Sequence, residues 1–131
     1  MSPATTALQD VARQIRALDA EFMKFARVKD AAGLTEAFYA EDAQLLAPGA
    51  PVIRGKAAIR DFWTGFLQVA GPEVTIDSQQ IEGAGDLAYC VGRYDGEIAG
   101  ARQQGKFVVV FRRQADGGYK AIADIFNADH S

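Results

Sequence analysis

The chain has 131 residues, of which 49% are hydrophobic and 24% charged. This composition suits one globular domain, residues 1–131, built around a single core. A formal net charge of −3, with no long basic segment, argues against nucleic acid or an anionic membrane as the main partner. A single cysteine, Cys90, excludes an internal disulfide, and a single histidine, His130, leaves no Cys/His cluster for zinc. We therefore expect no metal and no cofactor, and a metal site made only of carboxylates has no support in the sequence.

No apolar run approaches the roughly 18 residues that a membrane-spanning helix needs. The first ten residues, MSPATTALQD, lack both the basic region and the apolar region of a signal peptide. We therefore expect no membrane partner and a cytoplasmic location.

The N-terminal third of the chain has helical periodicity. Apolar residues recur at alternating steps of three and four, which predicts a long amphipathic helix; they are Leu8, Val11, Ile15, Leu18, Phe22 and Phe25. Asp30 then provides an N-cap for a second, shorter helix that we expect to end at Tyr39.

The next stretch changes element several times over a short distance. Glu41 and Asp42 are expected to form a turn, followed by a brief strand at 44–47 and an extended piece at 52–53. Gly55 then opens a third helix, whose apolar residues fall on one face; they are Ile59, Phe62, Trp63 and Phe66.

The second half of the chain predicts four strands joined by short connections. We expect them at 73–81, 87–95, 102–114 and 119–127. The segment 83–88 matches the dinucleotide fingerprint G-x-G-x-x-A, but that site needs a helix after the glycines, and a strand follows here. A hairpin turn is the better interpretation. Helices followed by hairpin-linked antiparallel strands indicate an α+β fold.

The stretch 34–66 resembles the SnoaL-like and ketosteroid isomerase-like (DUF4440-type) families of the NTF2-like superfamily. The similarity rests on an A-E-D-A corner, a strand, a proline-bearing loop and the run GKAAIRDFW. The resemblance implies a cone-shaped fold in which N-terminal helices pack in a strongly curved antiparallel or mixed sheet. It also implies a pocket for a small, largely apolar ligand.

Asp124 is the most informative polar residue, because it lies in the apolar sequence AIADIFN. Strand alternation places it on one face with Ile122 and Phe126. A carboxylate on a buried face is costly unless it is hydrogen-bonded, paired or protonated. Two interpretations stay open: a structural acid satisfied by a tyrosine, a tryptophan or a backbone N–H, and an acid/base catalyst. The closing strand also resembles the family pattern A-x-(A/V)-D-x-(F/W)-N, which implies that Asp124 and Asn127 belong to the pocket.

Tyr94 shares a strand face with Cys90 and Gly92, and the resemblance implies that this face points inward. Its hydroxyl is a candidate donor to a ligand oxygen; the alternative is a core tyrosine that reaches a backbone group at the rim. Cys90 has no histidine to activate it and is better read as a small buried apolar residue. The full set of expected ligand contacts is Phe22, Leu45, Ala47, Phe62, Cys90, Gly92, Ile122, Phe126 and Asn127.

The steroid isomerase of this family uses an Asp base together with a tyrosine and a protonated Asp in its oxyanion hole. In this chain the base position falls on Ala47, and the tyrosine position falls on Phe22 or Met23. The second Asp would fall within 105–107, which reads GKF. None of these residues has the required chemistry, so we do not expect a true ketosteroid isomerase.

Two classes of function remain. The first is an enzyme that uses Asp124 for acid/base chemistry of the isomerase, dehydratase or cyclase type on a compact apolar substrate, with Tyr94 orienting it. The second is a non-catalytic module for ligand binding, dimerisation or assembly, because one fold hosts many functions. A subunit that stabilises a partner enzyme is a third option. We also expect a homodimer, since the run FVVVF at 107–111 puts apolar residues on both faces of the sheet.

Overall fold

The computed structural model describes residues 3–130, with side chains described from residue 7 onward. The helices are α1 (Pro3–Arg27), α2 (Ala31–Phe38) and α3 (Lys56–Val69). The strands are β1 (Tyr39–Leu46), β2 (Ile53–Arg54), β3 (Thr75–Ala84), β4 (Leu87–Ile98), β5 (Ala101–Arg113) and β6 (Tyr119–Ala128). The predicted α+β arrangement is confirmed.

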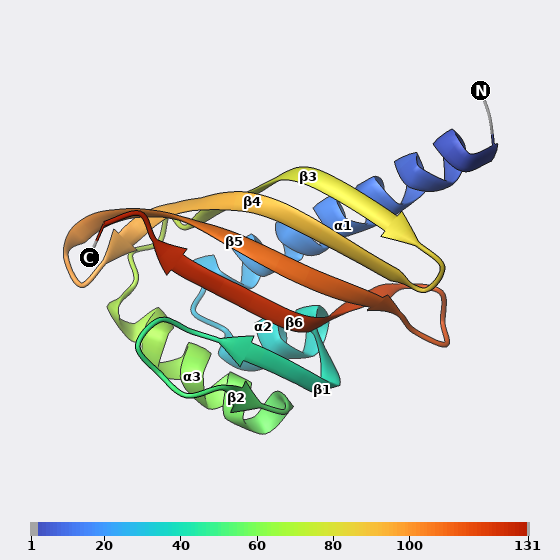
Figure 1. Cartoon of the computed structure of the whole chain (residues 1–131). Helices are drawn as coiled ribbons and strands as arrows, with labels where there is room; N and C mark the ends of the chain where they lie inside the picture. Colours follow the sequence, from blue (N-terminus) through green and yellow to red (C-terminus); the bar gives the residue numbers. More distant parts are fainter. Residues whose placement is uncertain (1–2, 131) are drawn as a thin grey trace.

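The strands form one mixed, six-stranded sheet in the order β2-β1-β6-β5-β4-β3. All neighbouring strands are antiparallel except β1 and β6, which run parallel. The last strand of the chain therefore lies between the first strand and β5. Figure 1 shows the sheet curving strongly, with α1 running behind β3, β4 and β5, and with α2 and α3 behind the β1 end.

The core fills the concave side of this sheet. Helix α1 contributes the buried residues Val11, Ile15 and Phe22, whose spacing matches the predicted amphipathic face. Helix α2 begins at the predicted cap, where the Asp30 side chain accepts a hydrogen bond from the Gly33 backbone N–H over 2.9 Å. Helix α3 buries Trp63 against the same core.

The start of β1 differs from the sequence prediction. Tyr39 is the C-cap of α2, as the predicted helix end requires, and is also the first residue of the strand. Glu41 and Asp42 lie inside the strand rather than in a turn. The reason is an irregularity in the pairing with β6, because the register moves from Tyr39↔Ala121 directly to Gln44↔Ala123. The bulged residues of β1 are exposed at Glu41 and Asp42, so their polar side chains remain in water.

A second bulge lies in β6. The pairing with β5 moves from Phe111↔Ala121 to Val110↔Ala123, which leaves Ile122 without a partner in the ladder. Residues on both sides of the bulge are then buried, Ala121 before it and Asp124 after it. The expectation that Ile122 shares the face of Asp124 by simple alternation is therefore wrong, because the extra residue changes the parity of the strand.

The glycine-rich segment after β3 is a hairpin turn, as expected. Gly85 has a φ of 61°, in the left-handed region that glycine adopts without strain, and β4 follows at once. No helix begins there, which removes the dinucleotide interpretation. None of the helices in residues 3–130 is long and apolar enough to cross a membrane.

Candidate functional site

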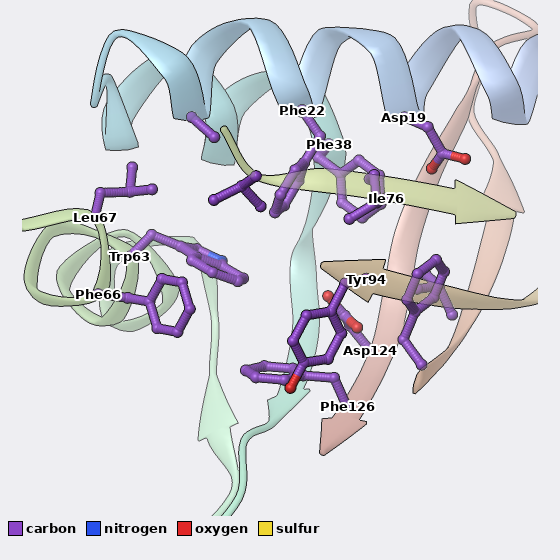
Figure 2. A pocket seen from close by; sticks show the side chains of 14 residues that line it. Asp19, Phe22, Phe38, Trp63, Phe66, Leu67, Ile76, Tyr94, Asp124 and Phe126 are labelled. Atoms are coloured by element: carbon purple, nitrogen blue, oxygen red, sulfur yellow. The ribbon is translucent and has the colours of Figure 1, made fainter. Parts of the chain in front are cut away.

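A cavity lies between α1, α3 and the concave face of the sheet, and its lining is almost entirely apolar. The volume open to the centre of a water molecule is about 60 Å³. Its walls are Asp19, Phe22, Ala26, Phe38, Trp63, Phe66, Leu67, Val74, Ile76, Tyr94, Phe107, Val109, Asp124 and Phe126. Figure 2 shows aromatic side chains approaching it from α1, α3 and the sheet, with the carboxyl groups of Asp19 and Asp124 on opposite sides.

Asp124 belongs to a buried hydrogen-bonded chain of three side chains. The Tyr39 hydroxyl donates to Oδ2 of Asp124 over 2.6 Å, and Nε1 of Trp63 donates to the Tyr39 hydroxyl oxygen over 3.1 Å. All three residues are buried, and Asp124 itself is 6% exposed. The chain fixes the orientation of the carboxyl group. It also satisfies only one of the two carboxyl oxygens, since no described group donates to Oδ1.

This environment raises the pKa of the Asp124 carboxyl group. Burial raises the pKa of the carboxyl to about 6, the hydrogen bond from Tyr39 lowers it, and the charge of Asp19 raises it. Burial and the neighbouring Asp124 charge also raise the pKa of the Tyr39 hydroxyl well above its ordinary value. Tyr39 therefore remains a hydrogen-bond donor at every physiological pH.

Asp19 is a second buried carboxyl group in the same cavity. It is 4% exposed, and the Ser78 hydroxyl donates to its Oδ2 over 2.5 Å. Burial raises its pKa to about 6 against the opposing effect of that hydrogen bond. Asp19 is not among the site residues predicted from the sequence. A signal was present, because Asp19 lies four residues after Ile15 and three before Phe22, on the apolar face of α1.

Tyr94 lies at the wall of the cavity beside the ring of Phe126, with the ring centroids 5.9 Å apart. Its hydroxyl donates to Oε1 of Gln103 over 3.1 Å, so it has a side-chain partner within the sheet. Burial raises its pKa above the ordinary value for tyrosine. The Tyr94 ring rests on Gly105, its register partner in β5, where any side chain atom would collide with the ring.

The structure brings four of the predicted site residues to the cavity wall: Phe22, Tyr94, Asp124 and Phe126. The other predicted contacts do not line it: Leu45, Ala47, Phe62, Cys90, Gly92, Ile122 and Asn127. Phe62 packs behind the wall, edge to face with Trp63 at 5.1 Å, and Asn127 is exposed. Leu45 and Cys90 are fully buried in the core, away from the cavity lining.

At the positions that match the catalytic residues of the steroid isomerase, the structure shows no side chain that could act as a base or as an oxyanion donor. Ala47 is buried just after β1, Phe22 is an aromatic wall of the cavity, and Met23 accepts a hydrogen bond from the Ile76 N–H through sulfur over 3.4 Å. Gly105 is required by the Tyr94 ring, as described above. A carboxylate at Gly105 would displace that ring.

Metal ligation has no candidate group in the described part of the chain. No cluster of three or more His, Cys, Asp or Glu side chains that could hold a metal ion occurs among residues 7–130. Cys90 is buried, and burial raises the pKa of its thiol to about 11. Cys90 is therefore a protonated thiol at neutral pH rather than a nucleophile.

The family model for the SnoaL-like domain matches residues 12–122. The chain belongs to the SnoaL-like domain family. The predicted resemblance is thereby confirmed over nearly the whole of the described chain. No curated protein matches it.

Solved structures show the same NTF2-like fold in proteins of distant sequence. A ketosteroid isomerase-like protein from Erwinia carotovora atroseptica is 16% identical with a TM-score of 0.79, covering 93% of this chain and 98% of that one. A Mycobacterium tuberculosis protein of unknown function is 21% identical with a TM-score of 0.84, covering 100% and 78%. An NTF2-like protein of unknown function from Shewanella oneidensis is 15% identical with a TM-score of 0.74, covering 88% and 97%. At these identities the likeness establishes the fold alone.

Proposed function

We propose that this single-domain SnoaL-like protein binds a compact, largely apolar small molecule and uses Asp124 as a general acid/base on it, in a reaction of the isomerase, dehydratase or cyclase type. The observation that supports this most directly is the position of Asp124. It is a buried carboxyl group with one oxygen held by Tyr39 and the other available to an aromatic cavity. Most buried polar atoms have a hydrogen-bond partner, so the second oxygen is suited to accept a hydrogen bond from a ligand.

The electrostatics of Asp124 suit proton transfer near neutral pH. General acid/base catalysis is most efficient when the pKa of the group lies close to the working pH. Burial brings the pKa of Asp124 to about 6, more than two units above its ordinary value of 3.8. Both protonation states are then accessible within a single catalytic cycle.

The size of the cavity favours a compact substrate. Pockets for drug-sized ligands typically occupy roughly 300 to 1,000 Å³, whereas this cavity has about 60 Å³ open to the centre of a water molecule. Its aromatic walls would contact an apolar body, and Asp124 would supply a polar contact from the wall. In this proposal Tyr94 orients the substrate from the wall beside Phe126.

A test that needs no knowledge of the natural substrate is proton exchange from a simple ketone. Cyclopentanone has a compact apolar ring and exchangeable protons beside its carbonyl. We expect the protein to accelerate their exchange with D₂O, followed by NMR, and Asp124→Asn to remove that acceleration. The chain has one tryptophan, Trp63, which lines the cavity, so its fluorescence reports ketone binding independently of exchange. Binding of the ketone without accelerated exchange in the wild type would support the alternative function, a non-catalytic ligand-binding module.

We also propose that the protein forms a homodimer through the convex face of the sheet. Large apolar side chains are exposed there on three neighbouring strands: Leu87, Tyr89, Val91, Val108 and Ile125. The register places Val91 opposite Val108, and Val108 opposite Ile125, so these side chains form one continuous row. Continuous exposed apolar surface of this kind marks association sites in proteins. Sedimentation equilibrium at micromolar concentration tests it, and a clean monomer would contradict it. A cytoplasmic location stays a prediction.

A further inference from the structure

Among the described residues, the cavity is lined by two acidic side chains and no basic one, and a neutral apolar substrate does not explain this excess of negative charge. Two of its lining residues, Asp19 and Asp124, are carboxylic acids, and no lysine, arginine or histidine lines it within the described chain. Each is at least nine-tenths buried. The charge of Asp19 also raises the pKa of Asp124.

Neither carboxyl group has a cationic partner inside the protein. Asp19 accepts from Ser78 and Asp124 accepts from Tyr39, and both donors are neutral hydroxyl groups. The basic residue that acts on Asp19 is Arg16, which is exposed on α1 and does not line the cavity. A buried carboxylate that lacks a counter-charge is costly, and a ligand that brings the opposite charge removes that cost.

The rest of the wall also suits a cation. Aromatic faces attract ammonium groups through their quadrupole, most strongly at tryptophan. The aromatic residues of the wall are Phe22, Phe38, Trp63, Phe66, Tyr94, Phe107 and Phe126. Several of these rings pack at right angles, as Phe22 does on Trp63 at 5.3 Å, so they present faces in more than one direction.

We propose that the ligand of this cavity is a compact apolar molecule carrying a protonated amine, which Asp124 binds through its free oxygen and Asp19 attracts from the opposite wall. This inference rests on the proposed function, because it assumes that the cavity is a ligand site. To the proposed function it adds that the ligand carries a positive charge. An ammonium group supplies the donor that Oδ1 of Asp124 lacks, and its charge offsets the negative charge of the two carboxyl groups.

Three probes with the same ring and different head groups test the charge of the ligand. They are cyclopentylamine, cyclopentanol and cyclopentanecarboxylate, titrated at about pH 7.5, above the pKa of both acids, with Trp63 fluorescence as the readout. We expect the amine to bind at least about tenfold more tightly than the alcohol, which is the value of one charge-assisted hydrogen bond. We expect no binding of the carboxylate.

Matched variants then assign the effect to the two acids. Asp124→Asn and Asp19→Asn keep the side-chain shape and remove the charge, and each should weaken amine binding at least about fivefold more than it weakens alcohol binding. The control is Asp77→Asn, because Asp77 is close enough to Asp19 to affect it, yet is exposed and outside the cavity. It should leave all three affinities unchanged. Detectable alcohol binding also shows that each variant keeps its fold.

The outcomes separate this inference from the function on which it rests. If the alcohol binds as tightly as the amine, the cation proposal fails and the site for a neutral apolar ligand stands. If the Asn variants bind the amine as well as the wild type does, Asp19 and Asp124 do not recognise it and the proposal also fails. If none of the three probes changes the Trp63 signal or the NMR shifts of the cavity side chains, both proposals are overturned.

Discussion

The hydroxyl of Tyr39 donates to Oδ2 of Asp124 over 2.6 Å, although 85 positions separate the two residues in the chain. Tyr39 is the first residue of β1 and Asp124 lies in β6, and these strands are the parallel pair of the sheet. The same hydroxyl accepts from Trp63 on α3. Tyr39 therefore connects β1, β6 and α3 at the candidate catalytic group. Because it binds Oδ2 of Asp124, it leaves Oδ1 for a ligand.

The stability of the protein should increase as the pH falls from about 7 toward about 4. Asp19 and Asp124 both have a pKa raised from 3.8 to about 6 in the folded state. A group whose pKa is raised by folding contributes stability that is complete below its unfolded pKa and is lost as the pH rises through its folded pKa. The raised pKa corresponds to about 3 kcal/mol for Asp124. Chemical denaturation between pH 4 and 8 measures this, and Asp124→Asn should reduce the slope.

The exposed carboxylates should reverse this trend only at lower pH. Ion pairs with lysine or arginine lower the pKa of these groups, so their contribution is lost as the pH falls below about 4; they are Glu36, Asp42, Asp95 and Asp129. A stability that falls steadily from pH 7 to pH 4.5 would contradict the assignment of buried, protonatable acids at positions 19 and 124.

Replacing Tyr39 by phenylalanine should damage both the fold and the titration of Asp124. The change leaves Oδ2 of Asp124 and Nε1 of Trp63 without partners in a buried region, at a cost of about 1 to 3 kcal/mol. It should also raise the pKa of Asp124 further, because the hydrogen bond that lowered it is lost. Carboxyl NMR titration and thermal denaturation measure the two effects. Tyr119→Phe is the control, since the Tyr119 hydroxyl contacts Arg113 instead; an equal shift in both variants would show that the effect is not local.

Gly105→Ala should displace the Tyr94 ring and destabilise the protein by about 1 to 3 kcal/mol. A Cβ atom at position 105 would collide with that ring and with the backbone oxygen of Asn127. Gly65→Ala is the matched control, because position 65 lies in α3 with nothing within 4 Å of the added atom. Alanine is favoured over glycine inside a helix, so the control should be neutral or should stabilise by up to about 1 kcal/mol. Equal stability of the two variants would contradict the described packing of Tyr94.

Val108→Lys should convert the proposed dimer into a monomer without unfolding it. Val108 is 38% exposed at the centre of the row formed with Val91 and Ile125. A lysine there stays in water in the monomer, whereas a dimer would have to bury its charge against a second copy. Sedimentation equilibrium of the variant beside Lys106→Arg, a charge-conserving change in the same strand, measures the effect. A dimer that survives Val108→Lys would place the interface elsewhere.

The protein should not catalyse the steroid double-bond shift. The base position holds Ala47, and the tyrosine position holds Phe22 or Met23. The second Asp position falls within 105–107, which begins with Gly105. None of these residues supplies a proton acceptor or an oxyanion donor. The conversion is followed by ultraviolet absorbance of the conjugated product. A robust rate above the buffer reaction would mean that another residue acts as the base. Asp124→Asn would then show whether that residue is Asp124.

The sequence was sufficient for the fold and for one acid of the site. Periodicity and turn residues predicted the helices and the four hairpin strands, and a carboxylate in an apolar strand indicated Asp124. Alternation could not predict the bulge at Ile122, because a bulge depends on how β6 pairs with β5 and not on the residues of β6 alone. A tyrosine was one of the partners expected for Asp124, but its identity as Tyr39 could not be predicted for a similar reason. Tyr39 caps the predicted helix, and only its tertiary pairing with Ala121 makes it a strand residue beside β6.

The position of β6 in the sheet has a consequence for how the chain folds during synthesis. Because β6 lies between β1 and β5, neither of those strands can pair on that side until Tyr119–Ala128 has left the ribosome. Contacts between distant segments form slowly, and unpaired strand edges promote aggregation. A chain that ends before Tyr119 would expose two such edges, on β1 and on β5, and would lack the strand that carries Asp124. The candidate site and the continuous six-stranded sheet are thus completed by the same late event.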